Sequence, residues 1–304
     1  MFLVGFYDTH IHGAFGVDTC DGSKDAILTM AKRLPEFGVQ GFCPTTMTTT
    51  FDVIYKAFEA VWEAKKELKS GVDVASILGM HLEGPFLSPV YAGVQNMECC
   101  IDPDKGYDMI TTLEKDFSGL LKIIDIAPEM PGAMDFIKEF SPKYSLSLAH
   151  TNCDYETACK AFEAGANSVT HVMNAMAPCD KRNPGVLGAL VDFPDVYCEV
   201  ICDGIHIAPP FLRMLFKLIR EDRLIIVSDS MRGSGMPDGV YKLAEVDVEV
   251  ANGRTYYGPN RGLAGSVTNM AEEVMRLQKF GIDDKLITLA SKENPLRRLG
   301  TNLL

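Results

Sequence analysis

The feature that most restricts the fold of this chain is the alternation of short β-rich segments with longer amphipathic ones. Several of the short segments are continuous apolar runs, which is typical of strands buried on both faces of a parallel sheet. We predict eight strands, over residues 3–8, 39–44, 75–82, 121–127, 145–150, 168–172, 196–202 and 224–229. The amphipathic segments predict helices over residues 23–34, 52–68, 154–164, 209–220, 267–280 and 283–290.

Eight strands alternating with helices indicate an α/β fold of the (β/α)₈ or TIM-barrel type. A length of 304 residues is ordinary for such a barrel, so we assign residues 1–304 to a single barrel domain. An open doubly wound sheet is the alternative, but no glycine-rich phosphate loop follows the first strand. Residues 238–261 contain an alternating apolar run and an Asn252-Gly253 pair, which together predict a small β-hairpin inserted after the eighth strand.

Charge and cysteine content restrict the partners and the compartment. A net charge of −12 argues against nucleic acid or an anionic membrane as the main partner. Nine cysteines without a Cys-x-x-Cys pair fit free thiols in a reducing compartment. The first residues have no basic leader or cleavage region, and no apolar run approaches the roughly 20 residues of a membrane span. We therefore expect a cytoplasmic protein.

The six histidines concentrate near the ends of the predicted strands. His10 and His12 close strand one, His150 and His171 end strands five and six, and His206 follows strand seven. Functional groups of a barrel collect at the carboxyl ends of its strands. Alternate residues of a strand point the same way, so His10 and His12 can reach one metal ion. A solvent-facing His-x-His is the alternative, but the further histidines favour metal binding.

Two carboxylates occupy corresponding positions on other strands. Glu83 closes the apolar third strand, where burial of a carboxylate is costly unless it is paired or bound to metal. Asp229 ends the eighth strand, where it could act as a general base toward an attacking water and return the proton to a leaving amine. An exposed loop glutamate and a turn aspartate are the alternatives. His81, two residues before Glu83, is interpreted as a structural or supporting residue rather than a ligand.

Seven segments taken together resemble the amidohydrolase superfamily, and within it the N-acetylglucosamine-6-phosphate deacetylases. The segments follow the family order over nearly the whole chain, at residues 8–13, 81–86, 149–151, 170–176, 203–206, 227–229 and 263–266. The specific ones are His-Leu-Glu-Gly-Pro-Phe at 81–86 and His-x-x-Asn-Ala-Met at 171–176. Family members usually carry terminal segments that form a small β-sandwich beside the barrel, and we expect this sandwich to be absent here.

The resemblance implies hydrolysis of the acetamide of N-acetylglucosamine 6-phosphate to glucosamine 6-phosphate and acetate, with Asp229 as the catalytic residue. It also implies one or two divalent metal ions per subunit, of which zinc and iron suit imidazole and carboxylate ligands. The implied ligands of the main ion are Glu83, His150 and His171, and those of a second ion are His10 and His12, with Glu83 bridging the two.

The same resemblance implies a homodimer that binds an amino-sugar phosphate. The implied substrate contacts are Asn174, Ala175, Arg182, His206, Leu263 and Gln95. In the family the arginine comes from the neighbouring subunit, and a guanidinium binds phosphate through two hydrogen bonds. Without this match, Arg182 would be interpreted as a surface arginine. Gln95 stands where many members carry a substrate-contacting histidine, which leaves its role open.

Two alternative functions stay open at this point. One is another amidohydrolase substrate, either N-acetylgalactosamine 6-phosphate or a cyclic amide. The other is a relative that binds metal or sugar phosphate without catalysis. Intact candidates at Glu83, His150, His171 and Asp229 argue against the second, because loss of an activity usually begins with its reactive groups.

Overall fold

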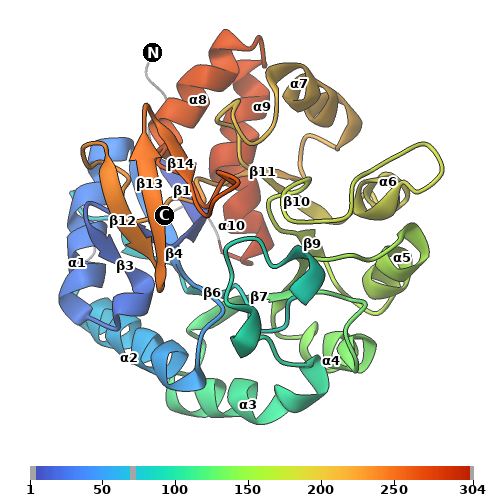
Figure 1. The fold of residues 1–304 in the computed structure, drawn as a ribbon, viewed down its shortest axis with the longest axis horizontal. Helices are drawn as coiled ribbons and strands as arrows, with labels where there is room; N and C mark the ends of the chain where they lie inside the picture. The colour runs from blue at the N-terminus through green and yellow to red at the C-terminus, as the bar shows by residue number, and fades with distance from the viewer. Residues whose placement is uncertain (1–4, 69–72, 302–304) are drawn as a thin grey trace.

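The computed structural model of the chain describes residues 5–68 and 73–301, and these residues form a parallel β-barrel surrounded by helices (Figure 1). The barrel strands hydrogen-bond in chain order, each parallel to the next. They are β1 (Phe6–Ile11), β4 (Val39–Thr46), β6 (Met80–Leu82), β7 (Leu121–Ile126), β8 (Ser145–Leu148), β9 (Ser168–Val169), β10 (Tyr197–Val200) and β11 (Leu224–Ile226). The short strand β5 (Ser76–Ile77) also pairs with β4.

Hydrogen bonds between the end of β1 and the segment that follows β11 close the barrel. The backbone N–H of Asp229 donates to the carbonyl of His10 at 3.0 Å, and that of His12 donates to the carbonyl of Ser230 at 2.9 Å. Ile11 and Ser230 also form a parallel bridge. The predicted TIM barrel is therefore confirmed, and the segment after β11 lies directly beside the end of β1.

Most predicted strands differ from the observed ones at their ends, and two of the differences have a clear physical cause. β1 extends to Ile11, so His10 lies inside the strand rather than after it; Ile11 N–H donates to the hydroxyl of Thr45 at 2.9 Å and holds this extension against β4. Residues 3 and 4 of the predicted strand lie outside the described residues. The predicted strand 75–82 is divided into β5 and β6 around Gly79, where a Cβ would come within 2.2 Å of the Lys122 side chain on β7.

Ten helices among the described residues surround the barrel, and none of them is long and apolar enough to cross a bilayer. They are α1 (Lys24–Arg33), α2 (Phe51–Glu67), α3 (Tyr107–Asp116), α4 (Ala133–Phe140), α5 (Tyr155–Glu163), α6 (Gly185–Asp192), α7 (Pro209–Leu218), α8 (Met270–Lys279), α9 (Asp284–Thr288) and α10 (Asn294–Arg298). A π-helical turn joins α9 to α10, and five short 3₁₀ turns lie in the loops.

Four of these helices, α3, α4, α6 and α10, are missing from the sequence prediction. They begin after Gly106, Gly132, Pro184 and Glu293, and none has a side-chain cap that would mark its start. The predicted helices α1 and α5 begin instead at Ser23 and Asp154, whose side chains accept hydrogen bonds from the first turn.

The cap of α5 gives a direct test of this reasoning. The Asp154 carboxylate accepts a hydrogen bond from the backbone N–H of Thr157 at 2.8 Å. We expect Asp154→Ala to lower the free energy of unfolding by about 1 kcal/mol, because one N–H of the first turn loses its partner. Urea denaturation measures this change. Lys160→Ala on the same helix is the control, and an equal loss in both variants would contradict a capping role.

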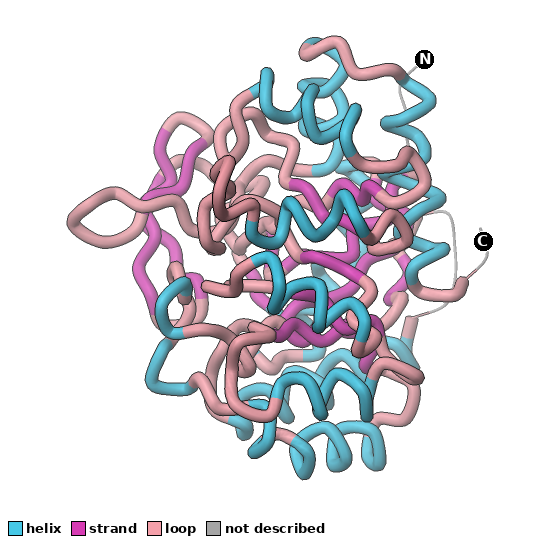
Figure 2. Tube along the Cα trace, turned by 90° about the vertical axis from the view of Figure 1, so that its right-hand side faces the viewer, coloured by secondary structure: helices cyan, strands magenta, loops and turns pink. Residues whose placement is uncertain are grey.

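The insertion after β11 is a three-stranded antiparallel sheet rather than the predicted hairpin. Its strands are β12 (Gly239–Leu243), β13 (Val246–Ala251) and β14 (Arg254–Tyr256). Val248 and Val250 of β13 are buried while the intervening Glu249 is exposed, as the alternation predicts. The Asn252-Gly253 turn is confirmed, with both residues at positive φ. The sheet stands apart from the barrel strands, at the left of Figure 2. A smaller ribbon, β2 (Gly13–Ala14) with β3 (Val17–Asp18), follows β1.

Candidate metal centre

A cavity of about 230 Å³ lies at the carboxyl ends of the barrel strands. Ten of the residues singled out from the sequence line it: His12, Glu83, Gln95, His150, His171, Asn174, Ala175, His206, Asp229 and Leu263. His10 lies directly beneath the cavity and is fully buried. Arg182 is exposed and is absent from the lining. The barrel therefore brings together groups from strands that are far apart in the sequence.

One cluster, which we call site A, consists of Glu83, His150 and His171. Glu83 follows β6, and its Oε1 lies 3.1 Å from His150 Nε2 and 3.0 Å from His171 Nε2. All three side chains are almost completely buried. Glu83 leaves the strand at Gly84, where φ is +83° and a Cβ would lie 2.0 Å from the hydroxyl of Thr48, so only glycine allows this sharp exit.

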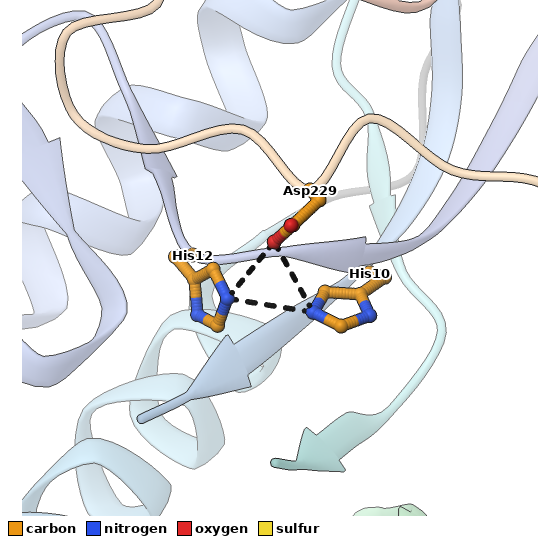
Figure 3. Close-up of side chains that lie close together, drawn as sticks. All are labelled: His10, His12 and Asp229. Atoms are coloured by element: carbon orange, nitrogen blue, oxygen red, sulfur yellow. Dashed lines mark hydrogen bonds and ion pairs between the residues drawn. The ribbon is translucent and has the colours of Figure 1, made fainter. Parts of the chain in front are cut away.

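The second cluster, site B, consists of His10, His12 and Asp229. Figure 3 shows their side chains pointing toward one another: His10 from β1, His12 from just after β1, and Asp229 from the segment after β11. Asp229 Oδ1 lies 3.4 Å from His10 Nε2 and 3.2 Å from His12 Nε2, and the two nitrogens are 3.4 Å apart. Glu83 Oε2 lies 3.2 Å from His12 Nε2, so this one carboxylate faces both sites.

The spacing of these donors fits a small divalent cation. Tetrahedral zinc with ligand bonds of about 2.0–2.1 Å separates its donor atoms by about 3.3 Å. The three donor separations of site B, from 3.2 to 3.4 Å, match that value. Imidazole nitrogens and carboxylate oxygens are also the donors that such ions prefer. These buried clusters are therefore consistent with a divalent metal site.

Hydrogen bonds on the far side of the rings orient several of these histidines. His12 Nδ1 lies 3.3 Å from the carbonyl of Thr45, and His150 Nδ1 lies 2.9 Å from the carbonyl of Tyr91. A carbonyl oxygen only accepts, so Nδ1 donates and Nε2 of the neutral ring is left as a ligand. This arrangement is typical of metal-binding histidines.

The carboxylates make the floor of the cavity favourable for positive charge. Burial lowers the pKa of His12, but its hydrogen bonds to Asp229 and Glu83 outweigh burial and raise that pKa to about 10. Burial raises the pKa of Asp229, but the hydrogen bond from His12 and the charge of His10 hold it below its ordinary value. Asp229 is therefore ionised near neutral pH. A field that retains protons on the imidazoles also favours a divalent cation in their place.

Backbone strain concentrates at the same residues. His150, His171, Asp229 and Ala175 all have positive φ, between 28° and 48°, a conformation that L-residues rarely adopt. Each such residue costs about 1–3 kcal/mol, which the surrounding fold must supply. Strain retained at three candidate metal-site residues and one cavity residue indicates that this geometry is selected for a purpose other than stability.

Gln95 supports Glu83 within the cavity. Its side-chain N–H donates to Glu83 Oε2 at 2.7 Å, while its Oε1 accepts from the backbone N–H of Thr48 at 2.7 Å. Asn174, by contrast, turns its side-chain amide back to the carbonyls of His171 and Val172.

His206 is held by a neighbouring carboxylate, Asp203. Its Nδ1 lies 2.8 Å from Asp203 Oδ2, and Asp203 Oδ1 accepts two backbone N–H groups of the same loop. Burial lowers the pKa of His206, but the bond to Asp203 raises it above its ordinary value. A raised pKa favours the protonated form of the ring, and that form would attract an anionic ligand to the cavity wall.

Three buried ionisable residues beneath the cavity, Asp125, Glu199 and Arg298, were not predicted, whereas His81 was interpreted as a supporting residue. His81 does not line the cavity; its Nε2 lies 2.9 Å from Asp125 Oδ1. Glu199 on β10 lies 3.2 Å from His10 Nδ1 and pairs with Arg298 on α10. The available signal was an acidic residue inside an apolar strand, which burial allows only when the charge is paired.

A closed α/β barrel with buried clusters of imidazole and carboxylate donors at the carboxyl ends of its strands is consistent with a metal-dependent hydrolase. The chain belongs to the amidohydrolase family, whose family model matches residues 1–280. It is 35% identical over 300 residues to the N-acetylglucosamine-6-phosphate deacetylase of Bacillus subtilis, a match that covers 98% of this chain and 75% of that relative.

Two further comparisons define the similarity. The N-acetylgalactosamine-6-phosphate deacetylase of Escherichia coli O157:H7 is 28% identical over 302 residues, covering 98% of this chain and 78% of that relative. A mutant N-acetyl-D-glucosamine-6-phosphate deacetylase from Mycobacterium smegmatis, solved in complex with N-acetyl-D-glucosamine-6-phosphate, is similar with a TM-score of 0.88 and 29% identity. That structural match covers 98% of this chain and 78% of the other.

Proposed function

We propose that this protein hydrolyses the acetamide of N-acetylglucosamine 6-phosphate to glucosamine 6-phosphate and acetate. The observation that carries the proposal is the convergence of Glu83, His150, His171, His10, His12 and Asp229 on one cavity. The similarity to deacetylases over almost the whole chain supports this substrate class.

Glu83, His150 and His171 would hold one divalent ion, and His10 and His12 a second, with Glu83 between them. When bound, the ions supply Lewis-acid activation of the attacking water and of the acetyl carbonyl. We assign proton transfer to Asp229, whose Oδ1 already faces both histidines of site B. Asp229 takes a proton as the water oxygen bonds to the acetyl carbon. It then gives that proton to the amine nitrogen as the C–N bond breaks.

The other cavity residues would bind the sugar phosphate. Asn174, Ala175, Leu263 and Gln95 line the same cavity as the proposed metal ligands and so can contact a sugar whose acetamide lies at the metal centre. His206 lines the cavity beside them, and its raised pKa favours the cationic form that suits a phosphate. Gln95 would also keep Glu83 in place, because it already donates to that carboxylate.

Arg182 is exposed within the single chain, so we propose that it binds the phosphate of a substrate held by the partner subunit of a homodimer. We expect Arg182→Met to raise KM for the phosphorylated sugar by about 10–100-fold, the value of lost charge-assisted hydrogen bonds. Turnover of unphosphorylated N-acetylglucosamine should not change. Steady-state kinetics measures both, and light scattering gives the subunit number. Lys181→Met is the matched control, and an unchanged KM in Arg182→Met would exclude Arg182 from substrate binding.

A second candidate substrate is N-acetylgalactosamine 6-phosphate. The relative from Escherichia coli O157:H7 bears that name and matches this chain over 98% of its length. The two sugars differ only in the configuration of one hydroxyl, so the same metal centre would serve both.

Acetate release with three substrates tests the proposal and separates the candidates. We expect the highest kcat/KM with N-acetylglucosamine 6-phosphate, a lower value with N-acetylgalactosamine 6-phosphate and the lowest with unphosphorylated N-acetylglucosamine. The reverse order of the two phosphosugars would favour the second candidate. No acetate from any of them, in protein shown to contain metal, would reject deacetylation of amino sugars.

A further inference from the structure

A third cluster of potential ligands lies directly beneath site B, inside the barrel. It consists of His10, His81 and Glu199, all fully buried. His10 belongs to both clusters, because its Nε2 faces Asp229 while its Nδ1 lies 3.2 Å from Glu199 Oε2. The two clusters therefore meet on opposite edges of one imidazole ring.

The third cluster already contains a cation, the guanidinium of Arg298. Arg298 is the last residue of α10, and its Nη1 pairs with Glu199 Oε1 while its Nε donates to the hydroxyl of Ser145 at 2.9 Å. Ser145 begins β8, so the guanidinium enters from the amino end of the barrel. Both side chains of the Arg298–Glu199 pair have no exposed surface. A metal ion placed there would meet a buried positive charge, which distinguishes this cluster from sites A and B.

The ion pair also determines which nitrogen of His10 carries the proton. Arg298 keeps Glu199 ionised, and an ionised carboxylate only accepts hydrogen bonds. His10 Nδ1 must then donate to Glu199, which leaves Nε2 of the neutral ring with its lone pair directed toward site B. Carboxylate–histidine pairs of this kind orient metal ligands and increase their basicity.

We propose that Glu199 and Arg298 form a positioning pair that fixes the ring of His10 and thereby sets the affinity of site B for its divalent ion. The inference rests on the proposed metal centre. The inference adds that the two sites differ in what determines their affinity. Site A does not depend on the Glu199–Arg298 pair, whereas site B depends on it and therefore on α10 at the opposite end of the barrel. α10 packs against β1, the strand that carries His10.

Zinc binding to the metal-free chain tests the proposal without reference to turnover. We expect the wild type to bind two zinc ions in competition with a chelating dye. Glu199→Gln should weaken the second ion by about 10–100-fold and leave the first unchanged. Because that variant leaves Arg298 buried without its partner, the double variant Glu199→Gln/Arg298→Met removes both charges together and should fold with the same loss of the second ion. Arg297→Met, an exposed neighbour on α10, is the matched control and should bind both ions normally.

NMR of ¹⁵N-labelled histidine reports which ring nitrogen carries the proton, and a chain with six histidines gives a spectrum simple enough to assign. The zinc-loaded wild type should show His10 protonated at Nδ1, and the double variant should lose this fixed state. Wild-type zinc affinity at both sites in the double variant would overturn the proposal, as would a wild-type chain that binds one ion. The two proposals can fail separately. If the double variant loses the second ion but the wild type with two ions releases no acetate, the positioning pair is supported and the deacetylase proposal is rejected.

Discussion

Asp229→Asn should lower kcat for N-acetylglucosamine 6-phosphate by about 10²–10⁴-fold while the protein keeps its metal. The range is that of a lost general acid–base residue. Asparagine has the same shape as aspartate and still offers an oxygen to His10 and His12, so the ligand cluster should survive. It cannot accept the proton of the attacking water. The variant should therefore bind substrate with little change in affinity and fail in the chemical step.

The measurement pairs steady-state kinetics with the metal content of the same sample. Asp238→Asn, an exposed aspartate at the start of the insertion, is the control and should have wild-type kinetics. Full activity of Asp229→Asn would remove Asp229 from proton transfer. Loss of metal along with activity would make Asp229 a necessary ligand instead, since its Oδ1 lies as close to the site B nitrogens as they lie to each other.

Removal of metal should lower turnover by about 10³-fold or more. Lewis-acid activation by a bound divalent ion contributes several kcal/mol to the stabilisation of a transition state, and each 1.36 kcal/mol is a factor of ten in rate. Without metal, Glu83 keeps only its contacts with the neighbouring imidazoles and Gln95, and no Lewis acid activates the water. Dialysis against a chelator, followed by acetate-release assays, measures the loss.

Zinc added back in steps should restore activity, and the step at which it returns shows which ion is needed. Recovery at one equivalent would assign the chemistry to a single ion, and recovery only at two would assign it to the pair. Circular dichroism of the apo sample is the control for folding. Unchanged turnover in a folded sample proven free of metal would exclude any catalytic role for the two sites.

The barrel could be predicted because burial imposes a simple pattern on its strands. β11, for example, is three apolar residues without an exposed position, as expected for a strand covered on both faces. Helices that begin with a side-chain cap, such as α5, could also be predicted from the sequence. α6 could not be predicted, because two glycines among its eight residues lower its helix propensity and no side-chain cap precedes it. β14 was not predicted, because three residues are too few to show the apolar–polar alternation of a strand.

The candidate site was predictable where its residues stand at or near the carboxyl end of a strand, but the buried ion pair beneath it was not. Glu83 and Asp229 stand at strand ends, and the parallel topology brings such ends together without further information. Glu199 and Arg298 are 99 residues apart, and their pairing depends on α10 reaching the amino end of the barrel. A single sequence contains no record of that contact. It contains only an unexplained acid within an apolar strand.

Site B straddles the seam at which the barrel closes. His10 lies in the first strand, His12 follows that strand, and Asp229 follows the last one. Backbone hydrogen bonds join Asp229 to His10 and His12 to Ser230 across the same boundary. An ion bound there would link the first strand to the segment that follows the last strand. Opening of the barrel there would then require release of the ion, so the free energy of unfolding should rise with the logarithm of the free ion concentration once that exceeds the dissociation constant. The atoms that bind the ion at the reactive centre would thus also stabilise the closed barrel.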